Sequence, residues 1–443
     1  MRYSNLVKLL LCFILSSSIS FANTNSNEEN FINDLIYANK PLQESDLTNP
    51  CNNTNIENRS MYTQWVCKSA ISTNTQDQNY LVIGSNGGQS AGHQATSEGI
   101  GFGIIISAGV MKILKTENKE STPLYQFAQQ VFTNNYQYLK NANKDRSSYP
   151  DHLNDGLYAW AYDNGKISSS PYSDTSASDG DMYIAAGLII AGEVTGNTSL
   201  KNEGNNAASA ILAHDVSSSG DYPNTVQIGD GANNGSLQNT QPSKAIFPLM
   251  YLFKNTTSST SEKQKWQLVI QQTLNFIKIQ LPNYHNLLPY FGNYSYQYGS
   301  DSARNAMNLG GLIIAINNDK ITTQDDIDNL HLAQDNLTNL INALSQYSTT
   351  IWLSGQQYAN IPTEVDNINT SPHASGQWTN SEYLSTTLTA LEALGNSNHS
   401  QFNFNELLTV IYPQYTVAQE GNNAPFNVGI RGLSDLIASN QFN

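Results

Sequence analysis

From Met61 to the C-terminus, the sequence is a succession of apolar segments at helical spacing, joined by connections rich in Gly, Asn and Ser. Thr122 and Pro123 supply a cap residue and a first-turn proline for one helix. Strand-like alternation is scarce, no repeated unit is detectable, and about a dozen helices of ordinary length fit into the chain. We therefore expect one all-α domain over residues 61–443, with further helices at 184–190, 207–212, 246–253, 266–279, 303–316, 327–344, 383–394 and 404–411.

The N-terminus has the pattern of a secretory signal peptide. Arg2 and Lys8 flank the start of an apolar run, Leu9 to Leu15, which is followed by small polar residues ending at Ala22. The run is shorter than the roughly 20 residues that span a bilayer. We expect cleavage after Ala22, a polar lead-in over residues 23–60, and an exported protein, secreted or periplasmic, with no membrane anchor.

The charge of the chain argues against two classes of partner. The formal net charge is −15 at pH 7, and loss of the two basic residues in the signal peptide takes it to −17. Nucleic acids and anionic membranes are polyanions, which such a chain repels. The charge tolerates a neutral polysaccharide and mildly favours a cationic one, although solubility alone would also account for it.

Two cysteines remain once the signal peptide is removed. Cys51 and Cys67 lie 16 residues apart in a chain expected to be exported, where disulfides form and persist. We predict a disulfide between them, which on the chain-entropy account stabilises the fold by about 3 kcal/mol. Two free thiols are the alternative.

Three stretches, far apart in the sequence, place carboxylates at the start of apolar segments. Glu98 precedes alternating glycines, Asp179 and Asp181 open the segment 184–190, and Asp301 lies three residues before Arg304. Hydrolysis of a glycosidic bond requires one protonated carboxyl, which protonates the leaving oxygen, and one ionised carboxylate, which activates water or attacks. Apolar surroundings favour the neutral form of a carboxyl, and a nearby arginine favours the charged form. The first and third stretches therefore fit an acid and a base.

Each stretch also has a simpler interpretation. Glu98 and Asp181 are carboxylates in a first helical turn, where they interact favourably with the helix dipole or serve as caps. Asp301 and Arg304 fit a surface ion pair worth a few tenths of a kcal/mol. Only the order and chemistry of the three stretches together favour a hydrolytic site.

Together these stretches resemble glycoside hydrolase family 8. The family's first motif, S-E-G-x-G-Y-G, is matched over Ser97 to Gly103 with Phe in place of Tyr, and its signature, A-(S/T)-D-(A/G)-D-x-x-(I/M)-A, is met over Ala177 to Ala185. Residues 157–160 resemble the family's L-x-A-W, residues 241–253 its N-P-S-Y-F-x-P-x-x-Y-x-x-F, and the third stretch its Y-D-A-x-R-x-P. The resemblance covers roughly residues 61–415.

The resemblance implies an (α/α)6 barrel that hydrolyses β-1,4-linked glycans with inversion, most directly as an endo-β-1,4-glucanase. Carried over by position, Glu98 is the general acid, Asp301 is the general base, and Asp179 contacts the sugar at the bond-cleaving subsite. The other residues that we expect at the substrate are Trp160, Tyr298, Arg304 and Asp181.

Several departures from the family leave the acid and base in place and leave the preferred sugar open. Ser300 stands where the family usually has Tyr, Ala306 replaces its Pro, and Lys244-Ala245 replace an aromatic pair. Aromatic rings supply much of the affinity for sugars, and the remaining candidates for such platforms are Trp160, Trp352, Trp378 and Tyr298. Trp266 lies at helical spacing and is expected in the core.

Other chemistries have less support. The seven histidines show no ligand spacing such as H-E-x-x-H, and the loop after Asp230 lacks the distal glutamate of a calcium hand. We therefore expect no cofactor and no metal, and a monomer whose partner is its polysaccharide. The same machinery acting on chitosan or xylan stays open, as does a glycan-binding protein that has lost turnover. A lyase would require Tyr/His pairs and uronate-binding cations, and the sequence shows no such constellation.

Overall fold

The structure, a computed structural model, describes the chain in segments. These are residues 29–37, 40–47, 50–51, 56–71, 82–84, 93–148, 155–232, 234–289, 297–320, 322–353, 356–362, 364–376, 380–395, 407–412 and 424–442. The expected signal peptide and Trp378 lie outside the described residues.

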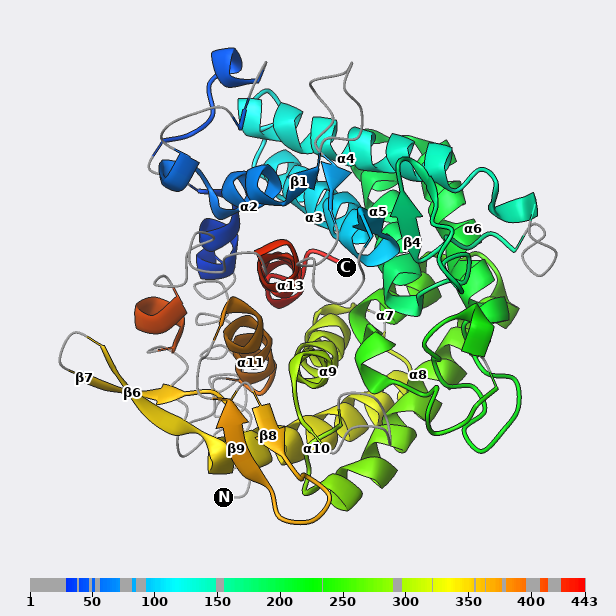
Figure 1. Cartoon of the computed structure of the whole chain (residues 1–443), viewed down its shortest axis with the longest axis vertical. Coiled ribbons are helices and arrows are strands. Elements are labelled where there is room, and N and C mark those ends of the chain that lie inside the picture. The colour runs from blue at the N-terminus through cyan, green and yellow to red at the C-terminus, as the bar shows by residue number, and fades with distance from the viewer. Residues whose placement is uncertain are drawn as a thin grey trace, which may run out of the picture.

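Among the described residues, six helices form the inner ring of a barrel (Figure 1). Each packs against the next along the chain, and the last, α13, closes the ring against α3. The ring consists of α3 (Ser97–Thr116), α5 (Ser178–Thr195), α7 (Phe247–Thr256), α9 (Ser300–Asn318), α11 (Ser381–Ala393) and α13 (Ala424–Ala438).

A second layer of helices covers the ring. In this layer α4 packs on α3, α6 on α5, α8 on α7, α10 on α9, the π-helix η8 on α11, and α2 on α13. The architecture is an (α/α)6 barrel, and the fold class predicted from the sequence is confirmed. The outer elements are α2 (Met61–Ser69), α4 (Pro123–Ala142), α6 (Thr198–His214), α8 (Thr260–Gln280), α10 (Gln324–Tyr347) and η8 (Leu407–Ile411).

The two layers differ in composition because they are covered differently. Inner helix α3 is buried except at Lys112, Lys115 and Thr116. By length and composition alone it could cross a membrane, but here it lies inside the barrel. Outer helix α4 buries one face, which includes Phe127 and Val131, and exposes the other, as an amphipathic helix does.

Two glycines bring α3 and α5 into close contact. A Cβ on Gly180 would lie 2.3 Å from Oγ of Ser97 and 2.9 Å from the backbone nitrogen of Glu98. A Cβ on Gly101 would lie 2.9 Å from Cβ of Tyr183. Only residues without a side chain allow the two helices to approach so closely. The first turns of α3 and α5 therefore lie side by side.

The described strands are short, and two pairs fix the entries to helices of the ring. β3 (Ala95–Thr96), which leads directly into α3, pairs antiparallel with β4 (Ala161–Asp163). β8 (Glu364–Asp366) pairs with β9 (His373–Gly376) and also forms a bridge to Tyr298, just before α9. The remaining strands are β1 (Ala70–Ile71), β2 (Val82–Ile83), β5 (Lys166–Ile167), β6 (Thr349–Leu353) and β7 (Gln356–Asn360). The short 3-10 helices are η1 (Glu44–Asp46), η2 (Ile56–Asn58), η3 (Arg146–Ser148), η5 (Asp230–Ala232), η6 (Pro242–Lys244) and η7 (Leu281–Tyr284).

A disulfide and a buried ion pair are among the bonds that attach the described part of the lead-in to the barrel. A disulfide joins Cys51 to Cys67 of α2. Residues 29–36 form a helix that contains Asp34. Oδ1 of Asp34 accepts a hydrogen bond from Nη2 of Arg431, in α13, at 2.6 Å. Because Arg431 is almost completely buried, this ion pair holds the N-terminal helix against the inner ring.

Candidate active site

The first turns of the inner helices meet at one end of the barrel. Four of these helices begin with the same pair, a serine followed by a carboxylate: Ser97-Glu98 in α3, Ser178-Asp179 in α5, Ser300-Asp301 in α9 and Ser381-Glu382 in α11. Lys244 ends η6 shortly before α7, and Phe426 lies in the first turn of α13. The positive ends of several helix dipoles are therefore directed at this cluster, which stabilises negative charge there.

Arg304 of α9 joins three of these carboxylates. Its Nη1 donates to Oε1 of Glu98 at 2.7 Å and to Oδ2 of Asp179 at 3.1 Å, and its Nη2 donates to Oδ1 of Asp301. The four side chains are at most 11% exposed. The guanidinium also lies over the ring of Phe426, 4.9 Å from its centre. A planar guanidinium can hold carboxylates from three helices in one arrangement because its donors are fixed in a plane.

Glu98 is suited to carry a proton near neutral pH. Burial raises the pKa of its carboxyl to about 7, against the opposing effect of Arg304 and with the support of the negative charges on Asp179 and Asp301. A general acid functions best when its pKa lies near the working pH. The local structure therefore gives Glu98 the property that the sequence analysis expected of an acid.

Asp179 is held in the opposite state. Its Oδ2 accepts from Nζ of Lys244 at 2.5 Å as well as from Arg304, and its Oδ1 accepts from the backbone nitrogen of Gly180 at 3.0 Å. Burial by itself would raise the pKa of Asp179, but Lys244 and Arg304 outweigh burial and hold that pKa below its usual value. Asp179 is therefore an ionised carboxylate between two cations.

Glu382 is a fourth carboxyl at the cluster that the sequence analysis did not single out. Its Oε1 accepts from Oγ of Ser300 at 2.7 Å, and its side chain is buried at the start of α11. Burial raises the pKa of Glu382 to about 8, although Arg304 and the bond from Ser300 act to lower it. At neutral pH this carboxyl is mostly uncharged. The repeated serine–carboxylate pair at helix starts is the signal that could have identified it.

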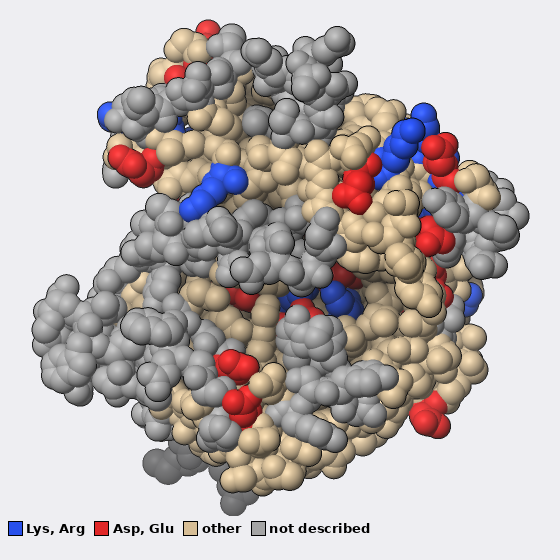
Figure 2. Space-filling view, viewed as in Figure 1, with Lys and Arg blue, Asp and Glu red and all other residues tan. Residues whose placement is uncertain are grey.

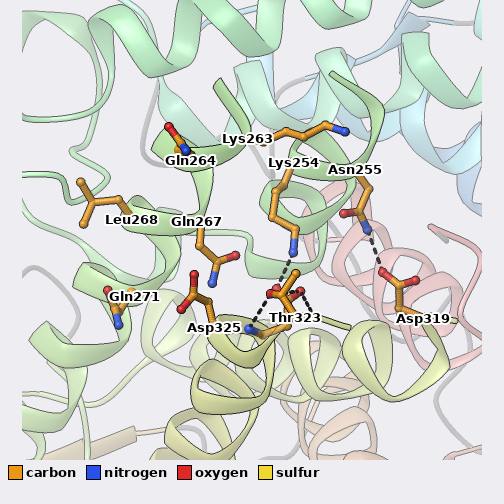
Figure 3. A pocket seen from close by; sticks show the side chains of 11 residues that line it. Lys254, Asn255, Lys263, Gln264, Gln267, Leu268, Gln271, Asp319, Thr323 and Asp325 are labelled. Carbon is orange, nitrogen blue, oxygen red and sulfur yellow. Dashed lines mark hydrogen bonds and ion pairs between the residues drawn. The ribbon is translucent and has the colours of Figure 1, made fainter. Parts of the chain in front are cut away.

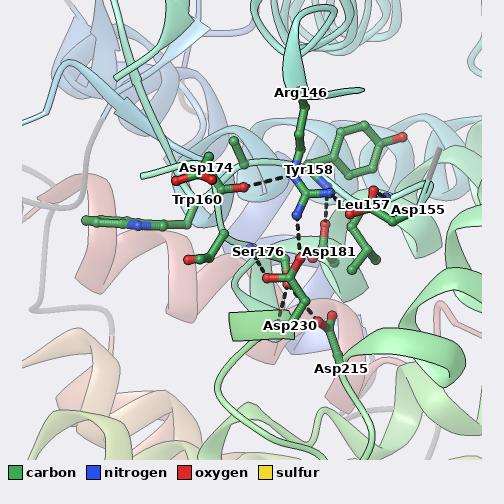
Figure 4. Close-up of polar contacts among 12 residues, drawn as sticks. Arg146, Asp155, Leu157, Tyr158, Trp160, Asp174, Ser176, Asp181, Asp215 and Asp230 are labelled. Carbon is green, nitrogen blue, oxygen red and sulfur yellow. Dashed lines mark hydrogen bonds and ion pairs between the residues drawn. The ribbon is translucent and has the colours of Figure 1, made fainter. Parts of the chain in front are cut away.

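Asp181 does not belong to this cluster, which corrects the expected substrate contact. Its side chain is completely buried, and its Oδ1 accepts from the backbone nitrogen of Tyr158 at 3.0 Å (Figure 4). It lies beside Asp215, and burial raises the pKa of both carboxyls, that of Asp215 to about 7. Asp181 is a structural residue of a second buried cluster.

Arg146 is the centre of that second cluster (Figure 4). Its Nη2 donates to Oδ2 of Asp230 at 2.5 Å, its Nη1 donates to Asp155, and its Nε donates to the carbonyl of Asp174 at 2.9 Å. The backbone nitrogen of Ser176 donates to the other oxygen of Asp230 at 2.7 Å. The cluster thus ties together three connections: the one before β4, which contains Asp155, the one before α5, which contains Asp174, and the one after α6, which contains Asp230. Asp230, considered above as part of a cation loop, is bonded to an arginine instead.

Trp160 lies beside the start of α3, where Glu98 is found. Its carbonyl accepts from the backbone nitrogen of Ser97 at 2.9 Å, one residue before Glu98. Its indole Nε1 donates to the carbonyl of Tyr172 at 2.9 Å, and the half-buried ring points away from Arg146 (Figure 4). The position is consistent with the aromatic platform that the sequence predicts.

Of the other candidate rings, the structure describes the side chains of Tyr298 and Trp266, and neither has a face free for stacking. Tyr298 is only 1% exposed and its backbone pairs with Val365, so its ring has no free face for stacking. This corrects the prediction for Tyr298, and the cause is the bridge to β8. Trp266 is buried against Phe253, as expected of a core residue. Of the remaining two, Trp352 lies in β6 with no side chain described, and Trp378 is outside the described residues.

Figure 2 shows a hollow near the middle of one face, with acidic and basic side chains gathered at its floor.

A separate pocket of about 680 Å3 lies between α7, α8 and the start of α10 (Figure 3). Its lining residues are polar or charged except Leu268, with Lys254 paired to Asp326, and include no aromatic ring. Within the described part of the chain, no group of His, Cys, Asp and Glu side chains is arranged to hold a metal ion.

Solved structures with the same fold include two named as glucanases and one of a protein complexed with xylose. A β-1,3-1,4-glucanase from Paenibacillus sp. X4 is 19% identical, with a TM-score of 0.57 over 91% of this chain and 94% of that one. An endo-1,4-D-glucanase from Vibrio fischeri ES114 is 14% identical, with a TM-score of 0.53 over 83% and 91%. Rex8A from Paenibacillus barcinonensis, complexed with xylose, is 12% identical, with a TM-score of 0.54 over 90% and 96%.

Sequence comparison identifies the family. No curated protein matches the chain. The family model for glycosyl hydrolases family 8 matches residues 73–303, just over half of the chain. That span includes Glu98, Asp179 and Asp301, the three carboxylates that Arg304 joins. The chain belongs to glycoside hydrolase family 8, and it is a glycoside hydrolase.

Proposed function

We propose that this protein is an endo-acting hydrolase of β-1,4-linked glucan that inverts the configuration at the cleaved bond. The observation that carries the proposal is the bridge that Arg304 makes between Glu98, Asp179 and Asp301 at the start of three inner helices. It gathers one carboxyl with a raised pKa and two carboxylates paired to cations. An inverting glycosidase needs these two kinds of group.

In the proposed reaction, Glu98 is the general acid and Asp301 is the general base. Glu98 gives its proton to the glycosidic oxygen as the bond from that oxygen to the anomeric carbon breaks. Asp301 accepts a proton from a water molecule whose oxygen forms the new bond to the anomeric carbon from the opposite face. Asp179, ionised between Lys244 and Arg304, accepts hydrogen bonds from hydroxyl groups of the sugar at the cleaved bond.

Xylan is the second candidate substrate. Of the three solved structures compared above, two are named as glucanases and the third is Rex8A complexed with xylose. The departures at Ser300 and Lys244 leave the acid and base unchanged, so the same mechanism applies to either polysaccharide.

We further propose that cleavage after Ala22 releases an exported, monomeric enzyme, which N-terminal sequencing and light scattering of the secreted protein would test.

The experiment compares the release of reducing ends from soluble cellulose, mixed-linkage glucan, xylan and chitosan. We expect the wild type to act best on one of the two glucans, and Glu98→Gln and Asp301→Asn to reduce the rate at least about 100-fold. Glu117→Gln is the matched control, because Glu117 lies at the other end of the same helix as Glu98. Full activity of either site variant would contradict the assignment of acid and base. Activity of the wild type on none of the four would contradict the proposed activity and favour a family member that binds glycans without turnover.

A further inference from the structure

Lys244 places a second cation inside the carboxylate cluster. It ends η6, immediately before the inner helix α7, and its side chain is 16% exposed. Its Nζ donates to Asp179 at 2.5 Å, and Asp179, Asp301 and Glu98 raise its pKa against the effect of burial. The ammonium is therefore charged in the working range of the enzyme.

The charges around Lys244 come close to cancelling. The charged groups that act on it are Glu98 from α3, Asp179 from α5, and Asp301 and Arg304 from α9. Two further titratable groups, Tyr183 from α5 and Glu382 from α11, interact with Arg304 and the carboxylates of the same cluster. When Glu98 and Glu382 hold their protons and Tyr183 is neutral, two carboxylates remain opposite two cations. The site is then electrically neutral although the whole chain has a net charge of −15.

We propose that Lys244 makes the cleft selective for neutral glycans, because it cancels the charge of Asp179 and repels glycans that carry protonated amines, such as chitosan. The inference rests on the proposed function and names the substrate class of the same site. A sugar ammonium near Asp179 would face two cations, of which Lys244 is the more exposed. At a separation of a few ångströms, one additional like charge weakens binding on the order of tenfold to a hundredfold. The acidic surface of the chain attracts a cationic polymer at long range, whereas the site itself rejects it.

The test compares hexamers of glucose, of glucosamine and of N-acetylglucosamine at a mildly acidic pH, where glucosamine is protonated. Lys244→Gln removes the charge and Lys244→Arg keeps it. Lys254→Gln is the matched control, since Lys254 forms a buried pair with Asp326 outside the site (Figure 3). We expect kcat/KM for glucosamine relative to glucose to rise at least about tenfold in Lys244→Gln. The ratio should stay unchanged in the other two variants. The kcat/KM for the neutral N-acetylglucosamine hexamer relative to the glucose hexamer should be the same in all variants. If kcat/KM for the glucosamine hexamer relative to the glucose hexamer is unchanged in Lys244→Gln, the proposal is overturned.

Two further readouts separate an electrostatic role from a structural one. Because Lys244 lowers the pKa of Glu98, Lys244→Gln should move the alkaline limb of the kcat/KM profile on the glucose hexamer to higher pH. An unmoved limb would overturn the proposal. If Lys244→Gln does not fold, the wild type alone is measured. Its relative activity on the glucosamine hexamer should rise with pH as the amines lose their protons, and a flat ratio would count against the proposal.

Binding distinguishes failure of this inference from failure of the proposed function. Calorimetry in the Glu98→Gln background should show the glucose hexamer bound at least about tenfold tighter than the glucosamine hexamer, with the difference lost in the Lys244→Gln double variant. That binding result would support the inference whether or not the wild type shows turnover. Absence of turnover by the wild type would overturn the proposed function and leave the inference standing. Tighter binding of the glucosamine hexamer by the wild type would overturn the inference alone.

Discussion

Arg304 and Glu98 lie 206 residues apart in the sequence, yet Nη1 of the arginine is 2.7 Å from Oε1 of the glutamate. The same guanidinium reaches Asp301 through its other terminal nitrogen. The proposed acid and base are thus held by one rigid group.

Replacing Arg304 by lysine should abolish most of the activity while retaining the positive charge. An ammonium is a point charge and cannot bridge three carboxylates in a fixed plane, so the acid and base lose their relative position. We expect kcat/KM to fall at least about 100-fold, a loss typical of misplaced catalytic groups. Arg59→Lys, at an ion pair with Asp46 outside the site, is the control. Near-normal activity of Arg304→Lys would show that charge alone suffices.

The alkaline limb of the pH profile should report Glu98. The acid must be protonated to act, so kcat/KM should fall as pH rises through about 7, the raised pKa of this buried carboxyl. Glu382, with a pKa of about 8, is the other group able to ionise nearby. In Glu382→Gln the limb should persist. If the alkaline limb disappeared from the profile of Glu382→Gln, the group that titrates would be Glu382 and not Glu98.

Trp160→Ala should raise KM more than it lowers kcat, because a platform binds the sugar without taking part in proton transfer. The residue sits beside Ser97 at the start of α3, and its ring is half-buried. Trp266→Phe is the control, since Trp266 is a core residue and its loss should lower the melting temperature without a change in KM. An unchanged KM in Trp160→Ala would remove the residue from the substrate site.

The second buried cluster should make stability depend on pH. Burial raises the pKa of Asp215 from 3.8 to about 7, so across that window the folded protein retains a proton that the unfolded chain releases. The carboxyl therefore weakens folding progressively as pH rises through the window. The free energy of unfolding of Asp215→Asn, relative to that of the wild type, should rise by on the order of 1–3 kcal/mol from pH 3.8 to about pH 7. Urea unfolding measures this, with the exposed Asp325→Asn as control, and parallel curves for wild type and Asp215→Asn would contradict the assignment.

The helical spacing of apolar residues was enough to predict one all-α domain, and the resemblance to glycoside hydrolase family 8 supplied the barrel. The structure adds the two layers: inner helices such as α3 and α5 are apolar on nearly all sides, and outer helices such as α4 are apolar on one. Glu98, Asp179, Asp301 and Arg304 were found because they open these helices within recognisable motifs, and the structure gathers all four.

The errors and omissions concern contacts that local sequence does not encode. Asp181 lies two residues after Asp179 and shares its helix start, but the loop that brings Tyr158 over it decides that it is buried. Tyr298 is adjacent to α9, but its pairing with Val365, far along the chain, buries the ring. Glu382 lies outside the motifs that identified the other carboxylates; it shares with them only the serine–carboxylate pair at a helix start, and its contact with Ser300 joins residues 82 positions apart.

The measurement that tests the central account most directly is proton NMR of the first products formed from a glucan hexamer by the wild-type enzyme. If Glu98 protonates the leaving oxygen while Asp301 activates water on the opposite face, the new reducing end must appear first as the α-anomer and then equilibrate. Initial accumulation of the β-anomer would mean retention through a covalent intermediate, and would contradict the roles assigned here to Glu98 and Asp301.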